Sequence, residues 1–281
     1  MKAIVFARLN AVQPIITGYH QLKIGPYIRR EKSKRKYTNY FTFQKSIAGE
    51  LFDKWRTSRM DSGAIVDEPP LEKINDGQRN KVYRFAALPH WDDYFKGLKN
   101  HRTLVLHLFE QMLNKKTKEQ LAGNKAPVIG VHVRRGDFRG LRSDEEFSKV
   151  GTVRTPERYF VETIVAIRRI HGAALPVSVF TDGYPHEFAE LFSMSNVTLI
   201  KGNLDIVDMI LLSKSKIIIT SAGSTFSYWA GFLSRAPVIM HPEHIHEPLR
   251  TEADLYEGPM NPDNAVLIRN IREISGTTKD S

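Results

Sequence analysis

The sequence predicts an α/β protein built around a parallel sheet, and three observations carry this prediction. From residue 126 onward, short runs of β-branched and other apolar residues alternate with segments of helical periodicity. The connections between them are short, and the apolar runs are continuous, which is typical of parallel strands covered on both faces by helices. The first half also mixes strand and helix patterns. We therefore expect two Rossmann-like α/β domains that face a cleft.

The first domain is expected over residues 1–125. Its second helical segment, residues 102–121, places Leu104, Leu108 and Met112 on one face. A boundary is expected near AGNKAP, residues 122–127. The expected strands are AIVF (3–6), AIVD (64–67) and VYRFA (82–86), and the expected helices are FQKSIAGELFDKW (43–55) and residues 102–121.

The second domain is expected over residues 126–261, followed by a polar tail, 262–281, with one helical turn near Ile268 and Ile271. Its clearest helix is residues 155–172, with Thr155 as N-cap, Pro156 in the first turn and Gly172 after the last turn. Its buried stripe would be Phe160, Ile164, Ile167 and Ile170. The expected strands are 127–133, 176–181, 197–200, 216–220 and 237–240, and the other expected helices are 184–192, 203–213 and 224–233.

The positive charge is concentrated at the N-terminus. The net charge is +10, and residues 1–60 hold 13 Lys and Arg against 3 Asp and Glu, whereas the rest is balanced. The densest run is RREKSKRK, Arg29–Lys36, which indicates either an anionic partner or a solvated loop. Cys is absent, and the apolar start is interrupted at Arg8 with no cleavage site after it. We expect a cytoplasmic protein.

Several common functional motifs are missing. The sequence has no Walker A loop, no G-x-G-x-x-G, no G-x-S-x-G elbow and no Asp-x-Asp. These absences disfavour typical ATPases, NAD enzymes and α/β hydrolases, and remove the usual handle for a nucleotide-bound cation. HPEHIH, residues 241–246, offers histidines, but a loop that lines a cleft is favoured over a metal site.

The most informative stretch is GVHVRRGDF, residues 130–138. An apolar strand ends here in Arg134 and Arg135, and strand ends of a parallel sheet open onto the ligand crevice. A guanidinium is permanently charged and matches two phosphate oxygens at a time. The pair therefore suits a diphosphate. The alternative is a surface ion pair of Arg135 with Asp137.

A second anion site is indicated by SKIIITSAGSTFSYW, residues 215–229, which is a strand, a turn of small residues and a helix start. Such a turn exposes backbone N–H groups at the positive end of a helix dipole. The hydroxyls of Ser221, Ser224, Thr225 and Ser227 add donors, although simple N-capping is the alternative. Upstream, Asp208 lies in an apolar helix and suits the two N–H donors of guanine, with a surface carboxylate as the alternative.

Together these stretches resemble the donor half of the α-1,2-fucosyltransferases over roughly residues 127–240, and more distantly the α-1,6- and protein O-fucosyltransferases. The resemblance implies a GT-B fold, GDP-β-L-fucose as donor, no metal or other cofactor, and inversion at the anomeric carbon. By position it assigns the diphosphate to Arg134 and Arg135, with His132 beside them, and guanine to Asp208. The phosphate-side loop would be Ser224, Thr225, Phe226 and Ser227, and Asp182 would also belong to the donor site.

The expected activity is transfer of fucose to a glycan hydroxyl in an α-1,2 linkage. Arg135 would stabilise the departing phosphate, and Asp137 or Glu145 would act as the base. The basic N-terminal segment is expected to dock an anionic or lipid-linked glycan, peripherally at a membrane face. Alternatives are transfer from another GDP-sugar, an inactive scaffold, or a nucleic-acid-binding protein, although no nucleic-acid partner is expected.

Overall fold

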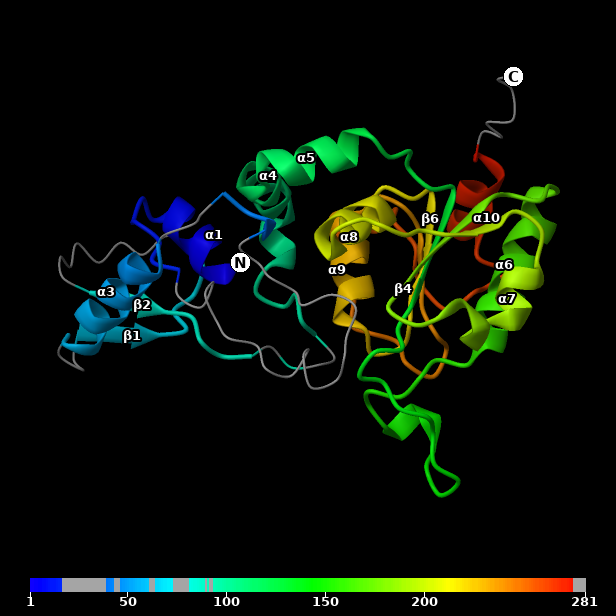
Figure 1. Cartoon of the computed structure of the whole chain (residues 1–281), viewed down its shortest axis with the longest axis horizontal. Helices are drawn as coiled ribbons and strands as arrows, with labels where there is room; N and C mark the ends of the chain where they lie inside the picture. Colours follow the sequence, from blue (N-terminus) through cyan, green and yellow to red (C-terminus); the bar gives the residue numbers. More distant parts are fainter. Residues whose placement is uncertain are drawn as a thin grey trace.

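The structure is a computed structural model that describes residues 1–16, 39–42, 46–60, 64–72, 81–88, 90 and 93–274. The basic run Arg29–Lys36, singled out in the sequence, lies outside these residues. The C-terminal half is organised around a six-stranded parallel sheet (Figure 1) in the order β5-β4-β3-β6-β7-β8. The strands are β3 (Ile129–Val133), β4 (Val177–Thr181), β5 (Val197–Leu199), β6 (Ile217–Ile219), β7 (Val238–Ile239) and β8 (Glu257–Gly258).

The five strands expected in this half are therefore confirmed, and β8 was not predicted. Glu257–Gly258 is only two residues long and has no apolar pattern, so it forms a strand through its pairing with β7 rather than through local propensity. The predicted α/β class with parallel sheets is confirmed.

Helices cover both faces of the sheet, because successive strand residues point to opposite sides. Ile217 and Ile219 pack beneath α6 (Glu157–His171), α7 (Ala189–Ser193) and α10 (Ala265–Arg272), whereas Ile218 packs beneath α8 (Asp205–Ser213) and α9 (Thr225–Leu233). The stripe predicted for α6 is buried, and this helix ends at Gly172 with a φ of 85°, as expected. The helical turn predicted near Ile268 is α10, whose Leu267 and Ile271 are fully buried.

Three local predictions were wrong. Residues 3–6 belong to a helix, α1 (Lys2–Leu9), since a short apolar run does not distinguish a strand from a buried helix. The helix expected over 102–121 is two helices, α4 (Arg102–Met112) and α5 (Lys115–Ala122), because Asn114 caps the second through the Thr117 amide at 2.8 Å. The N-cap position of α6 is Pro156, not Thr155.

The described N-terminal residues form a smaller parallel sheet and helices. The expected strands at 64–67 and 82–86 are β1 (Ile65–Asp67) and β2 (Val82–Arg84), which pair in parallel, and the helix expected at 43–55 is α3 (Ile47–Ser58). One apolar cluster continues from α1 and α4 to α8 and α9, with Phe95 stacked on Phe232 at 4.4 Å between ring centroids. The two halves are therefore packed together along this seam (Figure 1).

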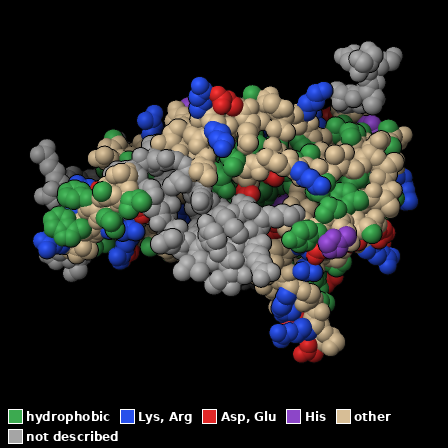
Figure 2. Space-filling view, viewed as in Figure 1, with side chains coloured by type: hydrophobic (Ala, Val, Ile, Leu, Met, Phe, Trp, Pro, Cys, Tyr) green, Lys and Arg blue, Asp and Glu red, His purple; other side chains and the backbone are tan. Residues whose placement is uncertain are grey.

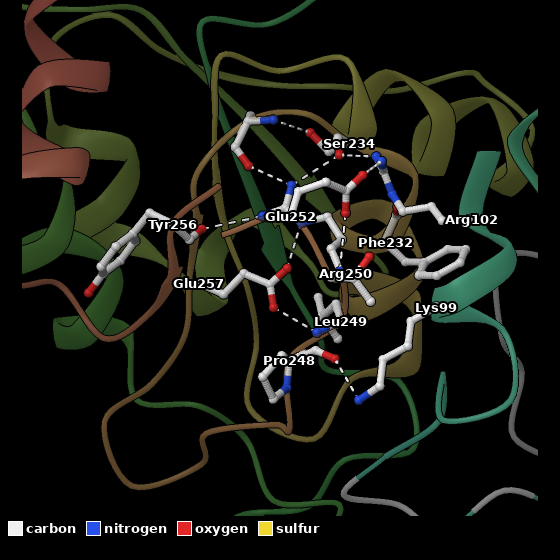
Figure 3. Close-up of polar contacts among 12 residues, drawn as sticks. Lys99, Arg102, Phe232, Ser234, Pro248, Leu249, Arg250, Glu252, Tyr256 and Glu257 are labelled. Carbon is white, nitrogen blue, oxygen red and sulfur yellow. Dashed lines mark hydrogen bonds and ion pairs between the residues drawn. The ribbon is translucent and has the colours of Figure 1, made fainter. Parts of the chain in front are cut away.

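A buried arginine fixes α4 to the end of α9 (Figure 3). Arg102 donates from Nε to the carbonyl of Phe232 at 2.6 Å and from Nη2 to that of Ser234 at 2.5 Å, and it pairs with Glu252. Arg250 adds a bond to the Ser234 carbonyl at 3.0 Å. These donors satisfy carbonyls that the end of a helix leaves without partners. The position of α9, whose other end belongs to the candidate site, thus depends on the N-terminal half.

None of the helices in the described ranges combines the length and the apolar character that crossing a bilayer requires.

Candidate functional site

The candidate site lies at the carboxyl ends of β3 and β6. From β3 the chain proceeds to β4 and β5 on one side of the sheet, and β6, β7 and β8 follow on the other side. The loops after β3 and β6 therefore run in opposite directions, and such a switch point is where open α/β sheets bind ligands. The sequence places the arginine pair directly after β3 and the small-residue turn directly after β6, so both predicted anion sites meet at this point.

Ser221 joins the two strand ends. Its Oγ accepts a hydrogen bond from the Arg134 backbone N–H at 2.8 Å and donates one to the His132 carbonyl at 2.8 Å. Because Ser221 is fully buried, these bonds are shielded from water. The main chain that carries the arginines is thus fixed to the turn after β6.

Asp182, which follows β4, holds the arginine pair from the other side. Its carboxylate accepts the Arg135 backbone N–H at 2.7 Å and forms an ion pair with the Arg134 guanidinium. A Cβ at Gly136 would lie 2.3 Å from Asp182 Oδ2, so the glycine of the R-R-G stretch is needed for this close approach. Arg134 also pairs with Asp137 at 2.5 Å. The alternative interpretation of an ion pair between Arg135 and Asp137 is therefore wrong.

Arg135 is a buried cation whose guanidinium contacts neutral groups. Its side chain lies over the ring of Phe188, 4.5 Å from the centroid, and donates to the Thr155 carbonyl at 3.1 Å. The residue is 7% exposed, and within the described part of the chain it has no ion-pair partner. Burial is the main cause that lowers the pKa of Arg135, with a contribution from Arg154; the carboxylates of Glu187, Glu157 and Asp182 oppose it. An anion placed at this switch point would compensate this charge.

The turn after β6 presents backbone donors at the start of α9. The Ala222 amide is bound by the Thr155 hydroxyl at 2.9 Å and the Gly223 amide by the Tyr228 hydroxyl at 3.0 Å. At Ser224, the N-cap residue, no side-chain capping bond is found in the described structure. The next three amides therefore have no acceptor within the helix, and the helix dipole adds positive potential there. Simple N-capping, the alternative interpretation, does not explain this turn.

His132 is neutral and packs beneath the turn. Its ring is stacked on Phe226 with 4.5 Å between centroids, and Nδ1 lies 2.7 Å from Ser227 Oγ and 3.4 Å from Ser224 Oγ. Burial is the main cause that lowers the pKa of His132 to about 3; Asp182 opposes it and Arg134 adds to it. His132 therefore positions the two serines without adding charge. Thr225, in contrast, is exposed at the first position of α9.

Asp208 lies apart from this cluster, in the first turn of α8. It is half-buried and accepts a hydrogen bond from Asn203 Nδ2 at 2.9 Å. Burial raises the pKa of Asp208 to about 6; the Asn203 bond lowers it, and the neighbouring Asp205 raises it further. No hydrogen bond or ion pair in the described ranges links Asp208 to the arginine pair.

The two candidate bases have different environments. Asp137 is 41% exposed and its Oδ1 accepts from Arg134 Nη2. Glu145 forms two hydrogen bonds of 2.6 Å with the Arg139 guanidinium and one of 3.0 Å with the Arg142 amide. These bonds lower the pKa of Glu145 to about 2, with the Arg139 side chain as the largest cause. A carboxylate stabilised so strongly in its ionised form is a weak proton acceptor.

Sequence reasoning missed two residues of the site, Thr155 and Tyr228. Thr155 was interpreted only as a helix cap, and Tyr228 only as part of a helix. The sequence around each residue does not indicate that its hydroxyl accepts a hydrogen bond from a backbone N–H of the turn after β6. His241 and His244 of HPEHIH lie beside Phe147, with His244 Nε2 2.5 Å from its carbonyl oxygen, whereas His246 stacks on Tyr94. In the described ranges, no three His, Asp or Glu residues form a group that could hold a metal ion.

No curated protein matches the chain. Among solved structures, the chain is similar to UDP-GlcNAc 2-epimerase from Methanocaldococcus jannaschii, in complex with UDP-GlcNAc and UDP, with 14% identity and a TM-score of 0.37. The matched region covers 66% of this chain and 47% of the epimerase. The chain thus spans about half of the epimerase. The NodZ α-1,6-fucosyltransferase soaked with GDP-fucose shares 15% identity at a TM-score of 0.36, over 75% of this chain and 68% of that one.

Residues 71–247 match the family described as Glycosyl transferase family 11, and this range includes the arginine pair, Asp182 and the turn after β6. The match extends well beyond half of the chain and confirms the resemblance to fucosyltransferases that these motifs predict. The chain belongs to glycosyl transferase family 11.

Proposed function

We propose that this protein transfers L-fucose from GDP-β-L-fucose to a hydroxyl of a glycan, forming an α-1,2 linkage with inversion at the anomeric carbon. One observation carries the proposal: Arg135, buried and without an ion pair among the described residues, and the start of α9, which has no side-chain cap, are joined through Thr155 at the switch point of the sheet. A guanidinium and the amides at the start of a helix are the donors that a diphosphate requires.

In this proposal the diphosphate binds at the start of α9, and Arg135 compensates its charge. Negative charge on the β-phosphate increases as the sugar departs, so a fixed cation in a buried site stabilises the transition state more than the bound substrate. Arg134 is already fixed by Asp182 and adds a second guanidinium at the same strand end. This pair can act on the leaving group with no divalent cation, and we propose metal-independent transfer on that basis.

The remaining site residues have supporting roles. His132, neutral beneath the turn, orients Ser224 and Ser227, and Phe226 covers its ring. Asp208, once ionised, accepts the N–H donors of guanine, for which the first turn of α8 offers a half-buried carboxylate. We propose Asp137 as the base of the two candidates, because it lies beside Arg134 at the end of β3, whereas the hydrogen bonds of Glu145 with Arg139 and Arg142 hold the Glu145 pKa at about 2.

The donor class is tested by thermal unfolding with GDP, UDP, ADP and TDP, each with EDTA present. We expect stabilisation by GDP alone, unchanged by the chelator. Stabilisation by all four nucleotides would remove the role of Asp208, and loss of the GDP effect in EDTA would contradict metal-independent binding.

The reaction is tested by incubation with GDP-fucose and with GDP-mannose in the presence of an oligosaccharide that ends in galactose. Fucose should appear on the galactose 2-hydroxyl, and the anomeric coupling in the product NMR spectrum should show the α configuration. Transfer of mannose instead would assign another GDP-sugar to the same site.

We propose that the natural acceptor is anionic or lipid-linked. The surplus of positive charge in residues 1–60 supports this proposal.

A further inference from the structure

Helix α3 exposes an apolar face to solvent. Ile47, Leu51, Phe52 and Trp55 are 60%, 59%, 58% and 50% exposed. At 100° per residue, these four side chains cover an arc of about 140° on the helix surface. Figure 2 shows hydrophobic side chains gathered at the end of the molecule where α3 lies, with Lys and Arg side chains beside them. Contiguous apolar patches of this kind mark interaction surfaces.

The charged side chains of α3 are arranged in the opposite way to those of an ordinary surface helix. Its two acids, Glu50 and Asp53, are each only 4% exposed, and they pair with Lys54 and Arg56. A helix that packs on a core normally buries its apolar face and exposes its acids. In α3 the acids are withdrawn from solvent and the apolar residues are presented to it.

The charge that α3 leaves at its surface is therefore positive. The side chains of Lys54 and Arg56 are 51% and 54% exposed, and on the helical projection they flank the apolar arc at its two edges. Arg59, which follows the helix, lies over the Trp55 ring at 4.6 Å from the centroid. An apolar strip with aromatic residues between basic edges is complementary to the interface of an anionic bilayer.

We propose that α3 docks this protein on an anionic lipid bilayer, with Phe52 and Trp55 at the boundary between headgroups and acyl chains and with Lys54 and Arg56 at the lipid phosphates. The helix has 12 residues and would lie in the plane of the interface. The surplus of ten positive charges in residues 1–60 adds attraction at the same end of the chain. The docking is independent of which sugar the site transfers.

Flotation of the full-length protein with vesicles tests the docking. We expect binding to vesicles of mixed phosphatidylglycerol and phosphatidylcholine, and none to phosphatidylcholine alone. The double variant Phe52→Ser, Trp55→Ser should reduce the partition at least about tenfold. Val165→Ser is the matched control, because Val165 is an apolar residue exposed by 41% on α6 and should leave the partition unchanged.

Two further variants separate the apolar and the charged contributions. Lys54→Gln, Arg56→Gln should weaken binding by about fivefold for each charge and reduce its salt dependence. Trp55→Phe should keep the partition, since phenylalanine is also apolar and aromatic, but should abolish the quenching of tryptophan fluorescence by brominated lipid in the same vesicles.

Three outcomes would overturn the docking. They are absence of wild-type binding to the anionic vesicles, an unchanged partition of the Phe52, Trp55 double variant, or full quenching in Trp55→Phe. Self-association in sedimentation velocity that the double variant abolishes would assign the face to a second copy of the chain. Should the double variant fail to fold, Ile47→Ser, Leu51→Ser replaces it. Thermal stabilisation by GDP, measured on every variant, reports on the proposed function separately.

Discussion

The carbonyl oxygen of Thr155 accepts a hydrogen bond from the Arg135 guanidinium at 3.1 Å. The hydroxyl of the same threonine accepts the backbone N–H of Ala222 at 2.9 Å. One fully buried residue between β3 and α6 therefore sets the position of the buried cation relative to the turn after β6. Both predicted halves of the anion site depend on it.

Thr155→Val should disturb the turn without removing the contact to Arg135. Valine has nearly the same shape but no hydroxyl, so the buried Ala222 amide loses its acceptor, at a cost of about 1–3 kcal/mol in the free energy of unfolding. Thermal stabilisation by GDP should also decrease. Thr155→Ser keeps the hydroxyl and is the control. If urea unfolding gives the valine variant the same free energy of unfolding as the parent, the Ala222 amide has found another hydrogen-bond acceptor.

Arg135→Ala should reduce kcat/KM for fucosyl transfer at least about hundredfold, which corresponds to about 3 kcal/mol of transition-state stabilisation. Arg135→Lys should recover little of this, because an ammonium cannot donate as a fork while it lies over the Phe188 ring. Arg158→Ala, which removes an exposed arginine on α6 that pairs with Glu162, is the control. Kinetics of Arg135→Ala that match those of the parent would contradict its role.

Asp137→Asn and Glu145→Gln distinguish the two candidate bases. We expect the first to lower kcat and the second to leave it near that of the parent, because the Glu145 carboxylate is already compensated by Arg139. Glu145→Gln should instead weaken the loop that this ion pair holds, visible as faster proteolysis between residues 139 and 145. A loss of kcat in Glu145→Gln with normal activity of Asp137→Asn would reverse the assignment.

Local patterns were sufficient to predict five of the six strands of the large sheet and the two anion-binding stretches. Each lies within about fifteen consecutive residues, where alternation, turn residues and a helix start can be recognised. The contacts that assemble the site could not be predicted in this way. Arg134 pairs with Asp182, 48 residues away, only because β4 lies beside β3. Thr155 meets Ala222, 67 residues away, because β6 lies beside β3 on its other side. The helix at 2–9 was missed for a related reason: burial against α4, not local propensity, determines its conformation.

Arg102→Met should lower the free energy of unfolding by on the order of 3 kcal/mol. The change leaves the carbonyls of Phe232 and Ser234 with fewer donors and Glu252 without its cation, whereas the methionine preserves most of the volume. Arg102→Lys should recover only part of the loss, since one ammonium cannot reach all three acceptors in the geometry of the fork. Urea unfolding measures both variants, and Lys115→Met on exposed α5 is the control. If the free energy of unfolding of Arg102→Met decreases no more than that of Lys115→Met, the hydrogen bonds of Arg250 are sufficient to hold the end of α9.

The affinity for GDP should depend on pH through Asp208. Its pKa of about 6 lies above the usual value of 3.8, so the carboxylate is largely protonated below pH 6 and cannot accept both N–H donors of guanine. GDP affinity should therefore decrease by about tenfold for each pH unit below 6. Asp208→Asn should remove this dependence, and inorganic pyrophosphate, which has no base, should show none of it in the parent.

The same shift determines the effect of Asp208 on stability. A carboxyl group whose pKa is raised in the folded state favours folding at low pH, and this contribution is lost as pH rises from 3.8 through about 6. At pH 8 Asp208→Asn should therefore raise the thermal midpoint while it weakens GDP binding. Isothermal titration and thermal unfolding measure the two effects on one sample. A variant that is destabilised at pH 8, or that binds GDP as tightly as the parent, would show that α8 uses this carboxylate for structure and not for guanine.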